Sequence, residues 1–237
     1  MVILAYSTIS DILSIALLKQ GESAPFAVFQ ERVFRSHATV LIPRIQALLE
    51  KESLRFEDLG AIAVCCGPGS FTGARIACAA ALGFSAFKEI PLLGITTFQM
   101  VARFLFEKTD AEKSPSLILL KSGHHEFCVE ALGRDLLPFP GPFEKPQCLE
   151  KQDLLDLLKS NKTPYIVGGD ALSLLENLKD TPLKSVKRSD FSEEGVIWAE
   201  WIGKAAVSLM KEGLYPPPVP LYVRPAYVKI PEGLTDA

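Results

Sequence analysis

The segment Gly67-Pro68-Gly69-Ser70-Phe71-Thr72-Gly73-Ala74-Arg75-Ile76 is the most distinctive part of this 237-residue chain. It follows an apolar run at 61–64, which predicts a buried strand, and it opens a long apolar segment that predicts a helix over 71–87. A glycine-rich turn between a strand and a helix can hold a phosphate group. The segment lacks the Lys-Ser/Thr pair of a P-loop and the glycine spacing of a dinucleotide site. The residues alone favour a tight turn in which Ser70 caps the helix.

The helix predicted after this turn is apolar on nearly every face over residues 76–87. A helix of this kind must be covered on all sides. Two interpretations stay open. The helix is either an ordinary central helix of the core, or it packs on a sheet with one side and on a partner subunit with the other, because a two-layer domain leaves an outer face uncovered.

The order of predicted elements indicates an α/β fold with a mixed sheet. The first half has strands at 2–6, 13–18 and 26–34, a helix at 39–50 with Thr39 as its N-cap, and then alternating strands and helices at 61–64, 71–87, 92–94 and 97–106. A charged segment at 107–114 marks the boundary between an N-terminal lobe, 1–110, and a C-terminal lobe, 111–237.

The second half repeats the element order of the first. Its predicted strands lie at 116–120, 126–131 and 165–167, and its predicted helices at 151–159, 171–178 and 193–211, followed by an extended tail. This repetition predicts a structural duplication of the two lobes.

Composition restricts the class of protein. Lys plus Arg is 25 and Asp plus Glu is 28, so the formal net charge of −3 gives no excess of positive charge for gripping nucleic acid unaided. Five cysteines without a CxxC pair suggest reduced thiols. We see neither a signal peptide nor an apolar stretch long enough for a membrane helix, and we expect a soluble, cytoplasmic protein that does not contact membranes.

Four separate pieces of the sequence carry a family resemblance. They are Ile3-Leu4-Ala5, the segment Gly67–Gly73 followed by Arg75-Ile76, His37 with Leu41, Pro43 and Ile45 after it, and Pro220-Leu221-Tyr222-Val223-Arg224 in the tail. In this order they resemble the TsaB (YeaZ) family, which is required for threonylcarbamoyl modification of the adenosine beside the tRNA anticodon. The resemblance implies an actin-like ATPase or sugar-kinase-like (ASKHA) fold, with two duplicated lobes whose mixed sheets are flanked by helices.

The resemblance also implies that the chain is not the catalyst and needs no cofactor. Family members look like degenerate relatives of the catalytic subunit TsaD and pair with it through their first two helices, here 39–51 and 71–87. The resemblance further implies that a TsaE-like ATPase joins the larger complex and that this chain acts on tRNA only indirectly, through its partner. Homodimers are expected when the partner is absent. The predicted partner-facing residues are Leu41, Ile45, Leu48, Ile76, Ala77, Ala80, Ala81 and Phe84. The family-motif loop consists of Gly67, Pro68, Gly69, Ser70, Phe71, Thr72, Gly73 and Arg75.

The chain departs from nucleotide-hydrolysing members of this fold at both predicted phosphate loops. Tyr6-Ser7-Thr8 stands where the first loop would carry a carboxylate, and Lys121-Ser122-Gly123 stands at the equivalent place in the second lobe. Serine does not supply the anionic ligand that Mg²⁺ favours. Gly168-Gly169, followed by Asp170, resembles a nucleotide-contacting turn, but a plain turn with Asp170 as an N-cap is the favoured interpretation.

The sequence leaves two enzymatic functions as alternatives to the role of a non-catalytic subunit. A small-molecule kinase of the same fold would bind ATP with Mg²⁺, and a peptidase would use Cys65 or Cys66 as its nucleophile, although core cysteines are the better interpretation. The histidines are His37, expected to cap or pack at the first helix, and the adjacent pair His124-His125, so we predict no metal site. Tyr222, Arg224, Tyr227 and Lys229 in the tail either touch RNA or pack across the surface.

Overall fold

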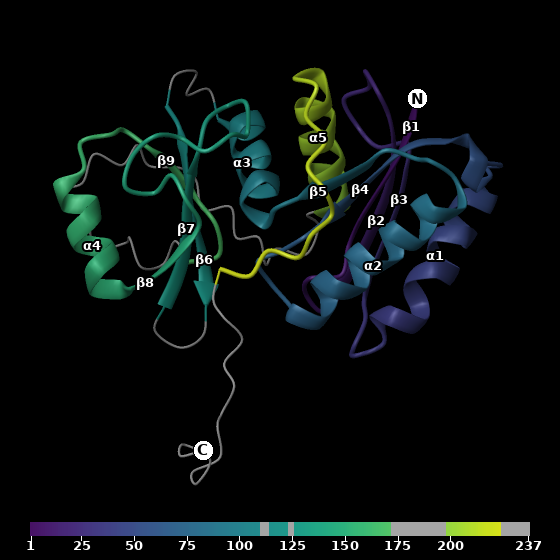
Figure 1. The fold of residues 1–237 in the computed structure, drawn as a ribbon, viewed down its shortest axis with the longest axis horizontal. Helices are drawn as coiled ribbons and strands as arrows, with labels where there is room; N and C mark the ends of the chain where they lie inside the picture. The colour runs from purple at the N-terminus through teal and green to yellow at the C-terminus, as the bar shows by residue number, and fades with distance from the viewer. Residues whose placement is uncertain (110–113, 123–125, 172–197, 224–237) are drawn as a thin grey trace, which may run out of the picture.

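A computed structural model describes residues 1–109, 114–122, 126–171 and 198–223 (Figure 1). Its first sheet has the strand order β3-β2-β1-β4-β5. These strands are β1 (Val2–Ser7), β2 (Ile12–Lys19), β3 (Ala27–Arg32), β4 (Leu59–Cys65) and β5 (Leu92–Ile95). The helices of this half are α1 (His37–Lys51), α2 (Phe71–Phe87) and α3 (Thr97–Lys108), with a short 3-10 helix at Phe56–Asp58.

The second sheet repeats the topology of the first. Its order is β8-β7-β6-β9, formed by β6 (Ser116–Ser122), β7 (Glu126–Leu132), β8 (Gln147–Glu150) and β9 (Ile166–Gly168). In each sheet two antiparallel pairs are followed by a parallel pair, and the first sheet adds a second parallel pair between β4 and β5. A helix, α1 or α4 (Lys151–Ser160), connects the outer antiparallel strand to the first parallel one. The predicted α/β fold of two duplicated mixed-sheet lobes is confirmed.

The two sheets and their helices form stacked layers (Figure 1). Alternate residues of β1 face opposite ways, as the pleat of a strand requires. Leu4 and Tyr6 pack in the cluster that contains the buried side of α1 and α2, whereas Ile3 and Ala5 pack with α5 (Trp198–Lys211). In the second sheet, α4 covers one face and α3 the other. Helices α3 and α5 therefore lie between the sheets, and α1 and α2 form an outer layer.

Packing between the layers crosses the division of the sequence at residue 110. Helix α5 belongs to the second half of the chain, but the side chain of Leu18 in the first sheet packs directly over its Gly203. The backbone N–H of Ala199 in α5 also donates a 3.0 Å hydrogen bond to Ser14 of β2. Leu105 of α3, in the first half, packs over Gly168 of the second sheet. The lobes 1–110 and 111–237 remain a proposed division of the sequence.

The predicted elements recur with small changes at their ends. Helix α1 begins at His37 with Ser36 at its N-cap position, so the prediction of Thr39 as N-cap is wrong. The Thr39 hydroxyl donates to the backbone carbonyl of Ser36 at 2.9 Å and accepts no capping hydrogen bond. The last predicted helix ends at Lys211 as expected. The predicted helix at 171–178, beyond its first residue, and the start of the predicted helix at 193–211 lie outside the described residues.

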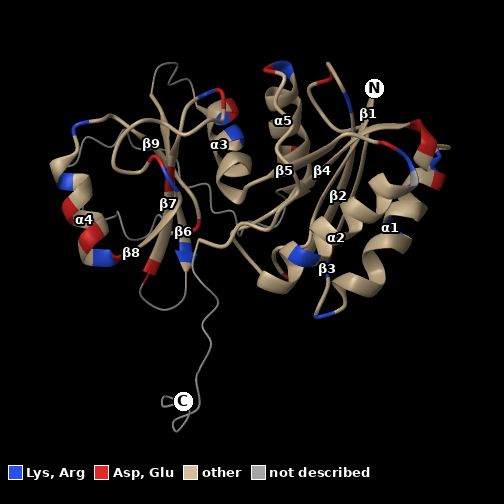
Figure 2. Cartoon of the chain, in the orientation of Figure 1, with Lys and Arg blue, Asp and Glu red and all other residues tan. Residues whose placement is uncertain are grey.

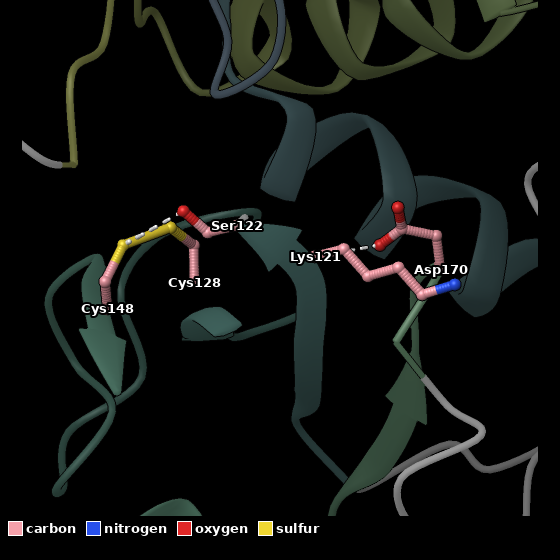
Figure 3. Close-up of a disulfide and its surroundings, with 5 residues drawn as sticks. All are labelled: Lys121, Ser122, Cys128, Cys148 and Asp170. Atoms are coloured by element: carbon pink, nitrogen blue, oxygen red, sulfur yellow. Dashed lines mark hydrogen bonds between the residues drawn. A yellow bond between two sulfur atoms is a disulfide. The ribbon is translucent and has the colours of Figure 1, made fainter. Parts of the chain in front are cut away.

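The expectation of five reduced thiols is wrong for two of the cysteines. Cys128 and Cys148 form a disulfide between β7 and β8 (Figure 3). The two residues are directly opposite in the antiparallel register, with their Cα atoms 4.2 Å apart. Strand pairing thus brings together two sulfur atoms that lie 20 residues apart in the chain. Cys65, Cys66 and Cys78 are free and buried.

Candidate protein interaction surface

The glycine loop leads into α2, and Ser70 caps the start of this helix, as predicted. The side-chain oxygen of Ser70 accepts a 3.1 Å hydrogen bond from the backbone N–H of Gly73, which satisfies one of the free N–H groups at the start of α2. The backbone N–H of Ser70 donates to the carbonyl of Ile9, in the turn between β1 and β2, at 2.6 Å. The loop is therefore held both within itself and against the first turn of the chain.

The glycines of this loop face the protein's own backbone. A Cβ atom at Gly73 would collide with the carbonyl of Thr8, and a Cβ at Gly69 would lie 2.9 Å from the carbonyl of Ile9. The hydroxyl of Thr8 also donates to the carbonyl of Gly73 at 2.7 Å. The space at these two glycines is thus occupied by the β1–β2 turn, which supports the tight-turn interpretation of the motif.

The proline-rich tail lies along the end of the first sheet. The backbone N–H of Gly94 in edge strand β5 donates to the carbonyl of Pro216 at 2.7 Å, and the N–H of Leu221 donates to the carbonyl of Cys66 at 2.8 Å. Proline lacks an N–H group and cannot extend a sheet, so prolines are suited to covering an exposed edge. The tail thereby reaches the glycine loop.

The tail motif meets the glycine-loop motif at a cluster of two rings and one arginine. The Arg75 Nε donates a 2.9 Å hydrogen bond to the hydroxyl of Tyr222. The rings of Phe71 and Tyr222 have centroids 4.5 Å apart, and the Arg75 guanidinium carbon lies 3.8 Å from the Phe71 centroid and 5.6 Å from that of Tyr222. We call Phe71, Arg75 and Tyr222 the arginine clamp. The other tail residues considered for RNA contact, Arg224, Tyr227 and Lys229, lie outside the described residues.

The predicted partner-facing residues divide into buried and partly buried sets. The buried set lies between the helices and the first sheet and consists of Leu41, Ile45, Leu48, Ala77 and Ala81. The prediction that these five face a partner is wrong, because they form the core side of α1 and α2. The partly buried set is Ile76, Ala80 and Phe84, and the Phe84 ring packs on Phe56 with centroids 4.5 Å apart.

The exposed side of α2 carries a different apolar set, which the sequence prediction missed. It consists of Ala79, Leu82, Gly83 and Ala86, in line with Arg75 at intervals of three or four residues. Leu82 is 54% exposed. On the neighbouring helix α1, Ile42 is 43% exposed, and Ala38, Pro43 and Ala47 are also exposed. We call these α1 and α2 residues, without Arg75, the outer face.

The outer face is nearly free of charge along α2. Arg75 is the single charged residue in the α2 sequence. Figure 2 shows the contrast with α4, which carries both blue and red segments, whereas α2 is almost entirely tan. Exposed apolar side chains grouped on an outer layer are typical of a protein interaction site. The alternative interpretation, that α2 is covered on all sides by its own fold, is wrong.

The buried cysteines do not fit a nucleophile. Cys65 is fully buried next to the Thr97 hydroxyl, and burial raises the pKa of its thiol to about 11. The contact with the Cys78 thiol, together with burial, raises the pKa of Cys66. A reactive cysteine needs a lowered pKa and access to substrate. The peptidase interpretation of these two residues is therefore not supported.

The histidines give no metal site among the described residues. His37 is buried at the start of α1, where its Nε2 lacks a hydrogen-bond partner and burial lowers its pKa. His124 and His125 lie outside the described residues, as does Gly123. Within the described ranges, no three His, Cys, Asp or Glu side chains are grouped so that they could hold a metal ion.

The second glycine turn also closes on its own chain. A Cβ at Gly169 would collide with the carbonyl of Leu119, and Gly168 is packed under Leu105. Asp170 accepts a 2.8 Å hydrogen bond from the backbone N–H of Lys121 through its carboxylate (Figure 3). These contacts favour the plain-turn interpretation of the segment over a nucleotide-contacting one.

The duplicated mixed sheets with helices on both faces define the actin-like, sugar-kinase-like class of fold. Two solved structures share it: YeaZ from Pseudomonas aeruginosa, with TM-score 0.68, 20% identity and 94% of this chain covered, and a P. aeruginosa protein with similarity to peptidase YeaZ, with TM-score 0.69, 21% identity and 94% covered. These structures are themselves covered to 100% and 99%. At this level of identity they establish the fold.

Sequence comparison identifies the family that the chain resembles. A model of the TsaD family, tRNA N6-adenosine threonylcarbamoyltransferase, matches residues 27–137. The TsaB protein of Escherichia coli is 32% identical over 122 residues, which is 51% of this chain and 51% of that protein. The TsaB protein of Buchnera aphidicola (subspecies Schizaphis graminum) is 29% identical over 170 residues, covering 71% of this chain and 78% of that protein. The predicted resemblance to the TsaB (YeaZ) family is confirmed, and the match spans about half the length of the E. coli relative.

No helix among residues 1–109, 114–122, 126–171 and 198–223 is long and apolar enough to span a membrane.

Proposed function

We propose that this chain acts in tRNA threonylcarbamoyladenosine biosynthesis as a non-catalytic subunit that binds a TsaD-like catalytic protein. The similar proteins of E. coli and B. aphidicola are named for this biosynthesis. The TsaD family model also matches the segment that contains α1 and α2, which supports a common origin with the transferase. The cytoplasm, where tRNA is modified, is the proposed location.

The loops that would bind nucleotide support the non-catalytic role. Ser7 and Thr8 are buried at the end of β1, where the chain offers hydroxyl groups and no carboxylate. Thr8 is hydrogen bonded to Gly73, and Asp170 in the second lobe is bonded to a backbone N–H. These groups serve the fold itself, so the chain is expected to need no metal or nucleotide for its role.

The single observation that carries the proposal is the exposed outer face of α1 and α2. Burying an apolar surface of about 800 Å² per partner is enough for a stable interface. Other apolar helices of the described chain are already covered, because α3 and α5 lie between the two sheets. A partner on the outer face would be held in a fixed orientation by two rigid helices, and we propose that this contact keeps the TsaD-like protein in its active conformation.

The proposed complex handles tRNA mainly through the partner. The chain has a net charge of −3, which gives no excess of positive charge for the phosphate backbone. A TsaE-like ATPase is proposed as a further component of the complex. When the TsaD-like protein is absent, the outer face is available to a second copy of the chain, and a homodimer is then expected.

The test is a binding measurement between this chain and the TsaD-like protein of the same organism. Leu82→Glu places a charge on the outer face, and Leu137→Glu makes the same change at an exposed leucine of the second lobe. We expect Leu82→Glu to abolish binding and Leu137→Glu to bind as wild type, with both circular dichroism spectra native. Equal binding by the two variants would exclude the outer face as the interface.

A calorimetric titration with Mg²⁺ and ATP tests the rival kinase function. Saturable, Mg²⁺-dependent binding to the isolated chain would contradict the proposed non-catalytic role, because the glycine turns described above leave no such site at residues 69 and 73.

A further inference from the structure

The arginine clamp lies at one end of the outer face. Arg75 is on the same side of α2 as Ala79 and Leu82, with spacings of four and three residues. It is therefore positioned to meet any protein that covers this side of the helix. As the only charge of α2, it also determines the electrostatic character of that surface.

The clamp restricts the movement of the Arg75 side chain. Its Nε is fixed by the hydrogen bond to the Tyr222 hydroxyl, and its guanidinium carbon lies 3.8 Å from the Phe71 ring centroid. Phe71 and Tyr222 remain 40% and 42% exposed, so the cluster is at the surface. A guanidinium group has five N–H donors, and the bond to Tyr222 uses one of them.

A comparison with Arg44 of α1 shows what the clamp lacks. Arg44 also lies over an aromatic ring, with its guanidinium carbon 5.0 Å from the Phe29 centroid, and it forms a 3.0 Å ion pair with Glu31. Arg75 has two rings, but within the described ranges it forms no ion pair with a carboxylate. The charge of Arg44 is thus neutralised by Glu31 within the chain, whereas Arg75 is oriented by the two rings and forms no ion pair among the described residues.

We infer that Arg75 donates hydrogen bonds to a carboxylate side chain of the TsaD-like partner and is a specificity contact of the interface. This inference rests on the proposed function. An arginine oriented by aromatic rings loses little side-chain freedom on binding, and its planar fork of donors matches a carboxylate. Arginine and tyrosine are enriched among the residues that dominate interface energies. The net charge of −3 favours a protein carboxylate over an RNA phosphate as the occupant.

Tyr222 and Phe71 act as positioning residues for this contact. Tyr222 comes from the tail, 147 residues beyond Arg75, and the tail is attached to the glycine loop through Leu221 and Cys66. The tail therefore has two roles: it covers the edge of the first sheet, and through Tyr222 it orients Arg75 at the interface. The inference also requires that loss of the Tyr222 hydroxyl weakens binding less than loss of the arginine.

The experiment measures the Kd for the TsaD-like protein with full-length variants at about 50 mM and 500 mM salt, where Debye screening differs strongly. At low salt we expect Arg75→Ala to weaken binding at least tenfold, Arg75→Lys several-fold and Tyr222→Phe two- to fivefold, and high salt should reduce the Arg75→Ala effect. Lys159→Ala, an exposed charge on α4, is the matched control and should bind as wild type. Arg75→Glu should abolish binding, and an Arg substituted for the matching acidic residue of the partner should restore it.

The possible failures separate the inference from the proposed function. If Arg75→Ala binds within twofold of wild type while Leu82→Glu abolishes binding, the outer face is the interface and the carboxylate contact is wrong. If both variants bind as wild type, the interface lies elsewhere and the inference is wrong. If the wild-type chain does not bind the TsaD-like protein at all, the proposed function itself fails. If Arg75→Ala weakens binding only when tRNA is added, the arginine contacts RNA and the inference is overturned. Thermal unfolding of each variant identifies any loss that is due to misfolding.

Discussion

The hydroxyl of Thr8 donates a hydrogen bond to the carbonyl of Gly73, while the carbonyl of Thr8 occupies the place that a Cβ at residue 73 would need. The turn after the first strand and the glycine loop before α2 therefore close directly on each other. This contact fixes the start of α2 relative to the sheet, and so it also fixes the orientation of the outer face.

Gly73→Ala is expected to destabilise the protein by about 1–3 kcal/mol, because the added methyl group collides with backbone that has no room to move. Gly83→Ala is the matched control in the same helix, where a Cβ has nothing within 4 Å. It should be neutral or stabilising by up to about 1 kcal/mol. Urea unfolding measures both changes, and equal stability of the two variants would contradict the close packing of this turn.

The disulfide predicts a stability that depends on redox conditions. Cys148→Ser should lower the free energy of unfolding by about 2–4 kcal/mol under oxidising conditions, because a crosslink over 20 residues restricts the unfolded chain. In the presence of a reductant, the variant and the wild type should differ by less than about 1 kcal/mol. Thiol titration of the oxidised wild type should find three free thiols, Cys65, Cys66 and Cys78, after unfolding. Five free thiols would contradict the crosslink.

Glu130 of β7 predicts a dependence of stability on pH. Its side chain is 5% exposed, its Oε2 has no hydrogen-bond partner, and burial raises the pKa of its carboxyl group to about 8. The pKa in the unfolded chain is about 4.3, so the unfolded state releases this proton first. Stability should then fall as pH rises from about 4.5 to about 8, by on the order of a few kcal/mol.

Glu130→Gln removes this titration and tests it. The variant should be more stable than wild type at pH 8, and its unfolding free energy should lose the decline between pH 5 and pH 8 that the wild type shows. Chemical unfolding at several pH values measures the difference. Parallel pH profiles for the two proteins would show that the carboxyl group does not titrate in this range in the folded state.

Strands and helix caps could be predicted from the sequence where a short stretch of neighbouring residues determines the local structure. The apolar runs of β1, β2 and β4 and the Ser70 cap depend on neighbouring residues, and their predictions are confirmed. The N-cap of α1 was predicted wrongly. A hydroxyl near the start of a helix can accept or donate a hydrogen bond, and the hydroxyl of Thr39 donates one. Local pattern therefore predicts element type better than the role of a single polar side chain.

The sequence predicted an interaction surface on α1 and α2, but it could not indicate which residues of these helices are exposed. On an almost wholly apolar helix, periodicity does not distinguish the side that packs on the sheet from the outer side. The predicted set accordingly included Ala77 and Ala81, which are fully buried, and omitted Leu82, which is exposed. The contact between Arg75 and Tyr222 depends on tertiary structure alone, since 147 residues separate them.

Hydrogen exchange of this chain with and without the TsaD-like protein tests the central claim most directly. The account predicts that binding slows exchange in peptides that cover residues 37–51 and 71–87, and leaves peptides that cover residues 147–160 unchanged. Slower exchange at 147–160 with no change in the two outer helices, or no change anywhere at saturating partner, would contradict it.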